Sequence, residues 1–222
     1  MSPTDDRREV PPAVGPVVRR YRRLERASGW ALAIGAAVVA VVAILALPLG
    51  PGVLVAAVVL AALRVPVVRR RGTARLTTDA DPAAVAAEFA GPTPPPLVFQ
   101  WGVADEIRST GGVATYEFSY LFGLRSVSMT VEVRSRDPDG DADEALELEV
   151  SAGGMPWARY AVSVWDSGEG SVVEMAVVSS RRFGLRRLPQ GLVAGRYYAD
   201  ALAAQGYAVA DRTSSFSIRD FD

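Results

Sequence analysis

The side chains best suited to chemistry in this sequence are its carboxylates, because the chain contains no histidine, no cysteine and no lysine. The segment DPDGDADEALE, residues 137–147, is rich enough in acids to suggest a calcium-binding loop. An EF-hand loop needs glycine at its sixth position and glutamate at its twelfth. Counted from Asp137, those positions hold Ala142 and Leu148, so we expect a solvated turn and no metal site.

Two close pairs of carboxylates, Asp105 with Glu106 and Asp166 with Glu169, are the other candidates for acid–base chemistry. A catalytic pair must face one cleft, in surroundings that separate the two pKa values. Neighbouring strand residues point to opposite faces, and the second pair flanks a turn, so we expect both pairs at the surface. No phosphate-binding loop, dinucleotide fingerprint or G-x-S-x-G elbow is present. We therefore assign no catalytic residue, no metal ligand and no cofactor.

The charges are divided unevenly along the chain. Residues 1–72 carry 11 arginines against 4 acidic residues, whereas residues 73–222 carry 13 arginines against 21 acidic residues. Nucleic-acid binding requires a basic face, so the acidic second part is not expected to bind nucleic acid.

Two apolar runs flank the stretch ALPLGPGV, residues 46–53. Trp30 to Leu47 has the length of a helix of about 27 Å, and Val53 to Val68 that of about 24 Å, close to the ~30 Å hydrocarbon core of a bilayer. The runs predict a transmembrane helical hairpin over residues 29–68, with helices at 30–47 and 53–68. A signal peptide and a buried hairpin of a soluble protein are the alternatives.

Arginines border both runs, and the turn between them has no charge. By the positive-inside rule, this pattern predicts a two-pass protein of the cell membrane with cytoplasmic N- and C-termini. Residues 1–28 would be a disordered to basic juxtamembrane tail. The candidate membrane-surface residues are Arg19, Arg20, Arg22, Arg23, Arg69, Arg70, Arg71, Arg181, Arg182, Arg186 and Arg187. The last four could instead pair with acids of their own domain.

Residues 72–222 have the pattern of a cytoplasmic α+β domain. A short strand at 75–80 precedes a helix that begins after Asp81 and stops at Gly91. Alternating apolar and polar residues from Ala114 to Val177 then predict about six antiparallel strands. A long helix follows over 188–205, with Leu188, Leu192, Gly195, Ala199 and Leu202 as its expected buried face, and a last strand over 207–218.

This order of elements, with the opening RLTTDADPAAVAAEFA, resembles the helix-grip fold of the START-like superfamily (polyketide cyclase, SRPBCC) over residues 72–206. The strand after the long helix departs from that pattern. The resemblance implies an antiparallel sheet gripping the C-terminal helix, with a hydrophobic ligand bound between them. The residues that would line the cavity are Tyr116, Phe118, Tyr120, Met129 and Leu192, which otherwise fill a packed core.

Three functions follow from these patterns. The first is a membrane-anchored cytoplasmic domain that binds a hydrophobic small molecule, a lipid or a partner protein at the inner membrane surface. The second is a cyclase- or hydratase-type enzyme that uses tyrosine, aspartate or glutamate in the helix-grip cavity. The third is a structural subunit whose hairpin packs against another membrane protein through its small residues.

Overall fold

The structure is a computed structural model that describes residues 12–120, 124–138 and 140–218. The helices are α1 (Gly15–Ala46), α2 (Leu49–Arg64), α3 (Pro82–Ala90), η1 (Pro95–Leu97), α4 (Val98–Trp101), η2 (Leu185–Arg187) and α5 (Leu188–Ala203). The strands are β1 (Pro66–Thr78), β2 (Glu106–Thr110), β3 (Val113–Tyr120), β4 (Arg125–Ser135), β5 (Glu144–Ala152), β6 (Met155–Asp166), β7 (Ser171–Ser179), β8 (Phe183–Gly184) and β9 (Ala208–Ile218).

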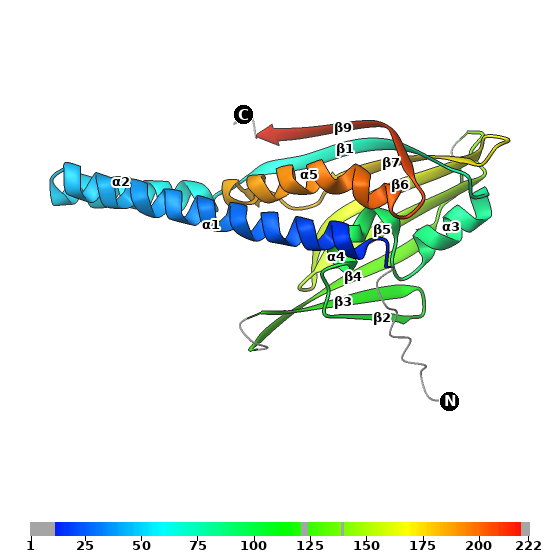
Figure 1. The fold of residues 1–222 in the computed structure, drawn as a ribbon, viewed down its shortest axis with the longest axis horizontal. Coiled ribbons are helices and arrows are strands. Elements are labelled where there is room, and N and C mark those ends of the chain that lie inside the picture. The colour runs from blue at the N-terminus through cyan, green and yellow to red at the C-terminus, as the bar shows by residue number, and fades with distance from the viewer. Residues whose placement is uncertain (1–11, 121–123, 139, 219–222) are drawn as a thin grey trace.

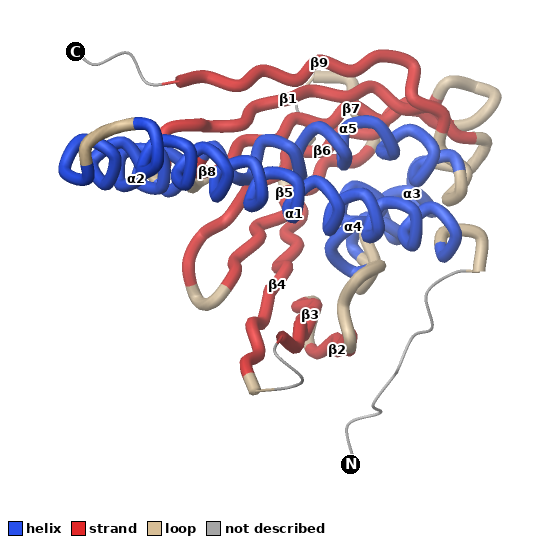
Figure 2. Tube along the Cα trace, turned by 60° about the vertical axis from the view of Figure 1, so that its left-hand side comes forward, coloured by secondary structure: helices blue, strands red, loops and turns tan. Residues whose placement is uncertain are grey.

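The strands form one antiparallel sheet. Strands β2 to β7 follow one another as a meander, and β1 lies beside β7 although it precedes the meander in the chain. On its other side β1 pairs with β9 over most of its length, from Val68 to Thr77. The helices α1, α4 and α5 lie together over one face of this sheet (Figures 1 and 2). The α+β class, the antiparallel sheet and the long C-terminal helix are thus confirmed.

The period-two pattern of the strands separates an apolar inner face from a charged outer face. Leu148, Val162 and Val173 are fully buried beneath the helices. Arginine–glutamate pairs cross the outer face, among them Arg159 with Glu147 at 2.7 Å. Exposed pairs of this kind stabilise a sheet by well under ~1 kcal/mol each, so the apolar face holds the layers together.

The short helix α3 starts as its sequence predicts, because the Asp81 carboxylate accepts a hydrogen bond of 2.9 Å from the Ala84 amide. The buried face of α5 differs from the expected one. Ala201 and Leu202 are buried with Tyr198 packed beside them, whereas Leu192 is 68% exposed. The buried face of α5 differs from the expected one because the helix also packs against α1. The apolar periodicity of α5 alone does not indicate this second contact.

Helix α1 corrects the expected domain boundaries. The basic segment and the first apolar run form one helix of 32 residues, and Val14, Val18 and Tyr21 along one side of it belong to the core of the sheet domain. A Cβ on Gly102 would lie only 2.8 Å from a methyl carbon of Val18, so the glycine permits α1 to approach the chain closely at the end of α4. The part of the tail from residue 15 onward is therefore helical and packed. Residues 1–11 lie outside the described residues.

The second boundary also moves. Strand β1 begins at Pro66, directly after α2, so the sheet domain starts before residue 72 and includes Arg69, Arg70 and Arg71. The second apolar helix has the expected length of 16 residues, but it lies four residues earlier in the chain than expected. Helix α2 begins at Leu49 and ends at Arg64, and the residues from Pro66 to Val68 pair within the sheet.

Residues 30–64 form a projection that we call the apolar stalk, built from the second half of α1 and from α2. The two helices lie side by side, and a Cβ on Gly52 would meet the Ala43 carbonyl oxygen at 2.7 Å. The stalk exposes large apolar side chains all round, such as Trp30 at 71% and Leu54 at 65%. Within the described chain, α1 alone is long and apolar enough to span a membrane by itself, with a mean hydropathy of 2.5 over its most apolar 18 residues.

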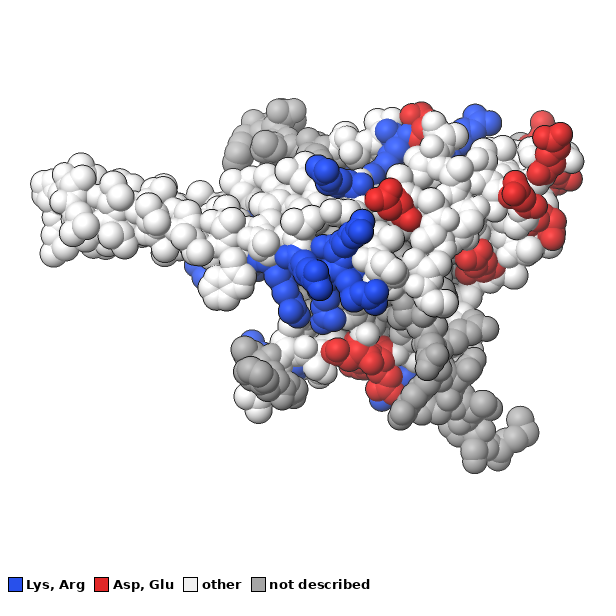
Figure 3. Space-filling model, in the orientation of Figure 1, with Lys and Arg blue, Asp and Glu red and all other residues white. Residues whose placement is uncertain are grey.

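Charge is distributed along the long axis of the molecule. On the face seen in Figure 3 the stalk is almost free of charged side chains, arginines gather where it meets the domain, and several acids lie at the far end. The far end includes the turn between β6 and β7 with Asp166 and Glu169, because β1 runs from the stalk to that turn, where Thr78 pairs with Ser171. At about 3.3 Å per residue, 13 residues of β1 span roughly 40 Å.

Candidate functional site: a cavity between the sheet and helix α5

A cavity of about 200 Å³ lies between the inner face of β1, β6, β7 and β9 and the helices α4 and α5. Small residues on both walls create it. Gly72 and Ala74 of β1 face Gly191 and Ala194 of α5, with Ala158 of β6 beside them. Larger side chains at these positions would fill the space between the layers, because protein interiors pack to crystal-like density. A volume of this size exceeds by more than tenfold the ~10–15 Å³ that one water molecule needs.

Most of the remaining wall is apolar. Trp157, Met175, Val177 and Phe183 contribute from the strands, and Phe99 of α4 closes the side toward α1. Trp157 and Phe183 meet edge to face, with ring centroids 6.4 Å apart. Such a lining favours an apolar ligand, or the apolar part of an amphiphilic one.

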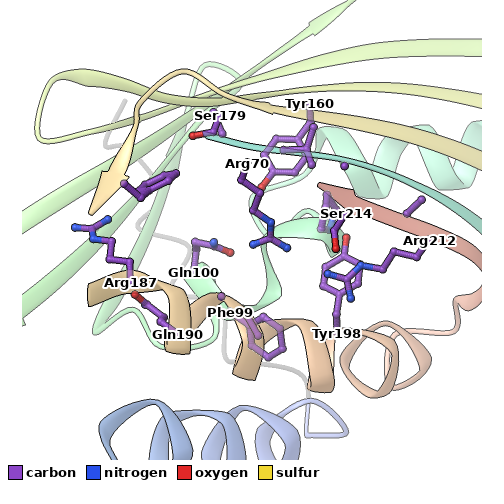
Figure 4. A pocket seen from close by; sticks show the side chains of 18 of the residues that line it. Arg70, Phe99, Gln100, Tyr160, Ser179, Arg187, Gln190, Tyr198, Arg212 and Ser214 are labelled. Atoms are coloured by element: carbon purple, nitrogen blue, oxygen red, sulfur yellow. The ribbon is translucent and has the colours of Figure 1, made fainter. Parts of the chain in front are cut away.

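Two arginines enter this space from neighbouring strands. Arg70 of β1 and Arg212 of β9 lie on the same face of the sheet as Gly72 and Ser214, which pair directly across the two strands. The Nη1 of Arg212 donates to the Gly195 carbonyl oxygen at 2.9 Å, and its guanidinium lies 4.5 Å from the centre of the Tyr198 ring. Figure 4 shows Arg70 extending into the middle of the cavity, with the Tyr160 and Tyr198 side chains near it.

Of the residues that the structure describes, no aspartate or glutamate lines the cavity. Within the described part of the chain, neither Arg70 nor Arg212 forms an ion pair with an acid. Burial lowers the pKa of Arg212, and the charge of Arg70 acts in the same direction, whereas Tyr198 opposes it. Among the described residues, the two guanidinium groups therefore form a positively charged region that no acidic side chain pairs with.

Tyr160, Tyr198 and Gln100 are among the other polar side chains that line the cavity. Burial raises the pKa of Tyr160 to about 12 and also raises that of Tyr198, so both hydroxyl groups are neutral hydrogen-bond donors at physiological pH. The Oε1 of Gln100 is buried and has no hydrogen-bond partner among the described residues. A buried polar atom left in this way costs about 1–3 kcal/mol, which a bound ligand or water would recover.

The cavity reaches the surface between α5 and β9. A shallower hollow on the outer side of α5 is lined by Leu192, Val193 and Arg196, and it shares Arg70, Gly191, Arg212 and Ser214 with the cavity. The shared residues mark the opening, so the arginine pair is accessible from outside the domain.

The five residues expected to line a ligand cavity lie elsewhere. Tyr116 and Met129 are buried in the core, where the Tyr116 hydroxyl donates to the Pro92 carbonyl oxygen at 2.9 Å. Phe118 is partly buried, and Tyr120 is 54% exposed because β3 extends beyond the helices. Leu192 lies in the outer hollow. None of the five borders the cavity described above.

The candidate membrane-surface arginines fall into two groups. Arg19, Arg20, Arg22 and Arg23 are exposed on α1, and Arg69 and Arg71 are exposed on the outer side of β1, whereas Arg70 points inward. Arg181, Arg182, Arg186 and Arg187 are exposed around β8 and η2, close to the end of α2, where a Cβ on Gly184 would lie 2.9 Å from the Leu63 carbonyl oxygen. In the described part of the chain, none of these four pairs with an acid.

The carboxylates considered for chemistry serve local structure. Asp105 accepts a hydrogen bond of 2.6 Å from the Ser119 amide, Glu106 pairs with Arg108, and Asp166 accepts from the Gly168 amide. Among residues 12–120, 124–138 and 140–218, no group of three or more acids is arranged to hold a metal ion.

Comparison with known proteins gives a fold likeness only. No protein-family model matches the chain, and no curated protein sequence does so. Among solved structures, a conserved protein from Geobacillus kaustophilus has 10% identity and a TM-score of 0.41, covering 62% of this chain and 93% of its own. A protein from Rhizobium loti has 22% identity and a TM-score of 0.38, covering 62% and 98%. A protein from Chromobacterium violaceum has 14% identity and a TM-score of 0.39, covering 64% and 98%. These likenesses are too distant to carry an argument about function.

The inward-facing residues of β1 are the part of the site that sequence reasoning missed. The alternation of Arg70, Gly72, Ala74 and Leu76 would have placed them on one face, had the strand been extended back to Pro66. The first residues of β1, from Pro66 to Val68, continue the second apolar run, and this conceals the start of the strand in the sequence. Arg212 and Ser214 follow the same alternation in β9, but only the pairing of β9 with β1 brings them to the cavity.

Proposed function

We propose that this protein crosses a membrane twice through the apolar stalk and holds its α+β domain at the cytoplasmic surface, where the domain binds a hydrophobic small molecule or lipid. The observation that carries the proposal is the position of α1, which begins inside the domain core at Val14, Val18 and Tyr21 and continues as the stalk. The chain returns to the same domain at Pro66. Both ends of the stalk are thus on one side of any membrane that the stalk enters.

The exposed surface of the stalk supports a membrane environment. Apolar patches of more than a few hundred Å² are rare on soluble monomers, and the stalk exposes large aliphatic side chains from Ile34 to Val58. The arginines at its base favour the cytoplasmic side by the positive-inside rule. Arg181, Arg182, Arg186 and Arg187 have no acid partner within the described part of the chain, which supports contact between this loop and anionic headgroups, at about 1 kcal/mol per arginine.

The cavity supports ligand binding because it adjoins the stalk. Gly184 and Leu188 border it at the end where β8 packs against the last turn of α2. A hydrophobic molecule leaving the bilayer would therefore have a short path to Phe183 and Trp157. The apolar lining and the buried, unpartnered Gln100 oxygen provide the contacts that such a ligand would satisfy.

Native mass spectrometry of the full-length protein, gently extracted from its membrane, tests the binding function. We expect one adduct of lipid or isoprenoid mass on the wild-type protein. An Ala194→Trp variant fills the cavity and should lose this adduct, whereas Ala199→Trp, on the exposed side of the same helix, should retain it. Equal adducts on both variants would assign the bound lipid to the stalk and overturn the ligand function.

A further inference from the structure

The arginine pair allows the class of ligand to be named, an inference that rests on the proposed binding function. We infer that the cavity binds a single-chain amphiphile with an anionic head, carboxylate or phosphate, and that the head lies between Arg70 and Arg212. The apolar chain would extend along Val177 and Trp157 toward Phe183.

The first argument is electrostatic. Two guanidinium groups on adjacent strands of one sheet face the same half-buried space, and no acid in residues 12–120, 124–138 or 140–218 lines it. Like charges in such a space repel more strongly than in water, because the local dielectric constant is lower. An anionic ligand would convert this repulsion into two charge-assisted hydrogen-bonding interactions.

The second argument is steric. Gly72 lies between Arg70 and Ala74 on the inner face of β1, and its partner across the strand pair is Ser214. A Cβ on Gly72 would lie 3.0 Å from the Thr213 carbonyl oxygen. Glycine therefore permits the close pairing of β1 with β9 at this point, and it leaves the inner face between Arg70 and Ala74 without a side chain. The Ser214 hydroxyl and the neutral Tyr198 hydroxyl line the same cavity.

The third argument concerns the division of the cavity into two ends. Figure 4 shows Arg70, Tyr198, Arg212 and Ser214 grouped together, with Ser179 and Arg187 on the other side of the space. Arg187 is the single arginine of the described lining on that side, 5.6 Å from the centre of the Phe183 ring. The arginine pair is therefore the better position for the head, and the opening between α5 and β9 gives the head a path inward.

The test uses Trp157 as a reporter, because it lines the cavity and bromine quenches a nearby indole. The full-length protein in nanodiscs of neutral phosphatidylcholine is titrated with 11-bromoundecanoic acid or with 11-bromoundecanol. A Trp157→Phe variant identifies the part of the quenching that comes from the cavity, since three other tryptophans are present in the chain. Empty nanodiscs of the same lipid correct for partitioning of each probe into the bilayer.

We expect the acid to bind at least about tenfold more tightly than the alcohol, as befits a hydrogen bond to a charged group. Arg70→Gln should weaken the binding of the acid much more than that of the alcohol, and so remove most of that difference. Arg69→Gln removes the same charge from the opposite face of the same strand and should keep the difference. Arg212→Lys should reduce the affinity for the acid less than Arg70→Gln does, because lysine retains the positive charge.

The alternatives give different results. Equal binding of acid and alcohol, with no effect of Arg70→Gln, would overturn the anionic head and leave the hydrophobic cavity standing. Absence of any Trp157-dependent quenching by either probe would overturn both this inference and the proposed function. Displacement of the acid by millimolar inorganic phosphate, with no binding of the alcohol, would assign the arginine pair to a free anion and overturn the amphiphile.

Discussion

The Tyr21 ring of α1 stacks on the Phe99 ring of α4, with their centroids 4.2 Å apart and their planes 27° from parallel. Both residues also border the cavity. A few residues along the helix, the Glu25 carboxylate accepts a hydrogen bond from the Nε2 of Gln190 in α5. The helix that leads into the stalk is thereby bound to two of the elements that form the ligand space.

Tyr21→Ala should destabilise the domain by about 3 kcal/mol, the typical cost of deleting a buried aromatic ring. Urea unfolding of the nanodisc-embedded protein, followed by tryptophan fluorescence, measures this free energy. The adjacent, exposed Arg22 supplies the control, since Arg22→Ala should change stability by less than about 0.5 kcal/mol. Equal effects of the two variants would contradict the packing of α1 on the domain.

Single cysteines can report the topology directly, because the natural chain has none. We expect Gly50→Cys, at the tip of the stalk, to react with a membrane-impermeant maleimide added to intact cells. Glu169→Cys, in the exposed turn between β6 and β7, should react only after the membrane is opened. Labelling of Glu169→Cys in intact cells would place the domain outside and refute the cytoplasmic orientation.

The stalk offers a matched pair of glycines for testing the contact between α1 and α2. Gly52→Leu should separate the helices, because even a Cβ there would lie 2.7 Å from the Ala43 carbonyl oxygen. Gly50 has nothing within 4 Å of its Cβ position, so Gly50→Leu should be tolerated. Overpacking costs about 1–3 kcal/mol, and thermal unfolding in nanodiscs should therefore show a lower Tm for Gly52→Leu alone. Unchanged thermal stability of that variant would mean that the helices do not pack as described.

The four arginines of the loop around β8 and η2 should respond to lipid charge. In nanodiscs containing anionic lipid, we expect slower hydrogen exchange in residues 181–187 than in neutral nanodiscs. Replacement of Arg181, Arg182, Arg186 and Arg187 by glutamine should remove this difference. If the wild-type protein exchanges equally in both lipids, the contact with headgroups is absent.

The parts of the fold that follow local rules could be predicted from the sequence. Asp81 and Pro82 fix the start of α3, and the alternation through Leu148 and Val162 gives the inner face of the sheet. The rest depends on contacts distant in sequence. Nothing near Arg70 or Arg212 in the chain indicates that the two residues meet, because they are brought together only by the pairing of β1, the first strand in the chain, with β9, the last. The cavity was missed for this reason.

The packing of α1 against the domain could not be predicted for a different reason. A stretch with five arginines between Arg19 and Arg26 indicates a solvated or headgroup-bound helix, and its buried side consists of only Val14, Val18 and Tyr21. Such a narrow apolar stripe is easily outweighed by the charges around it. Only the presence of α4 and α5 reveals that the stripe has a protein partner.

The position of α1 also sets an order of events during synthesis. Glu25 leaves the ribosome 165 residues before its partner Gln190, a separation that takes roughly ten to thirty seconds at about 5–20 residues per second. The stalk follows α1 immediately and is ready for insertion long before α5 exists. During that interval the stripe of Val14, Val18 and Tyr21 has no protein surface to cover it, and the arginines beside it favour a temporary place among the lipid headgroups. In the proposed membrane topology, completion of the sheet would then bring the helix from the bilayer surface into the core, so that the cavity closes only after α5 has been synthesised.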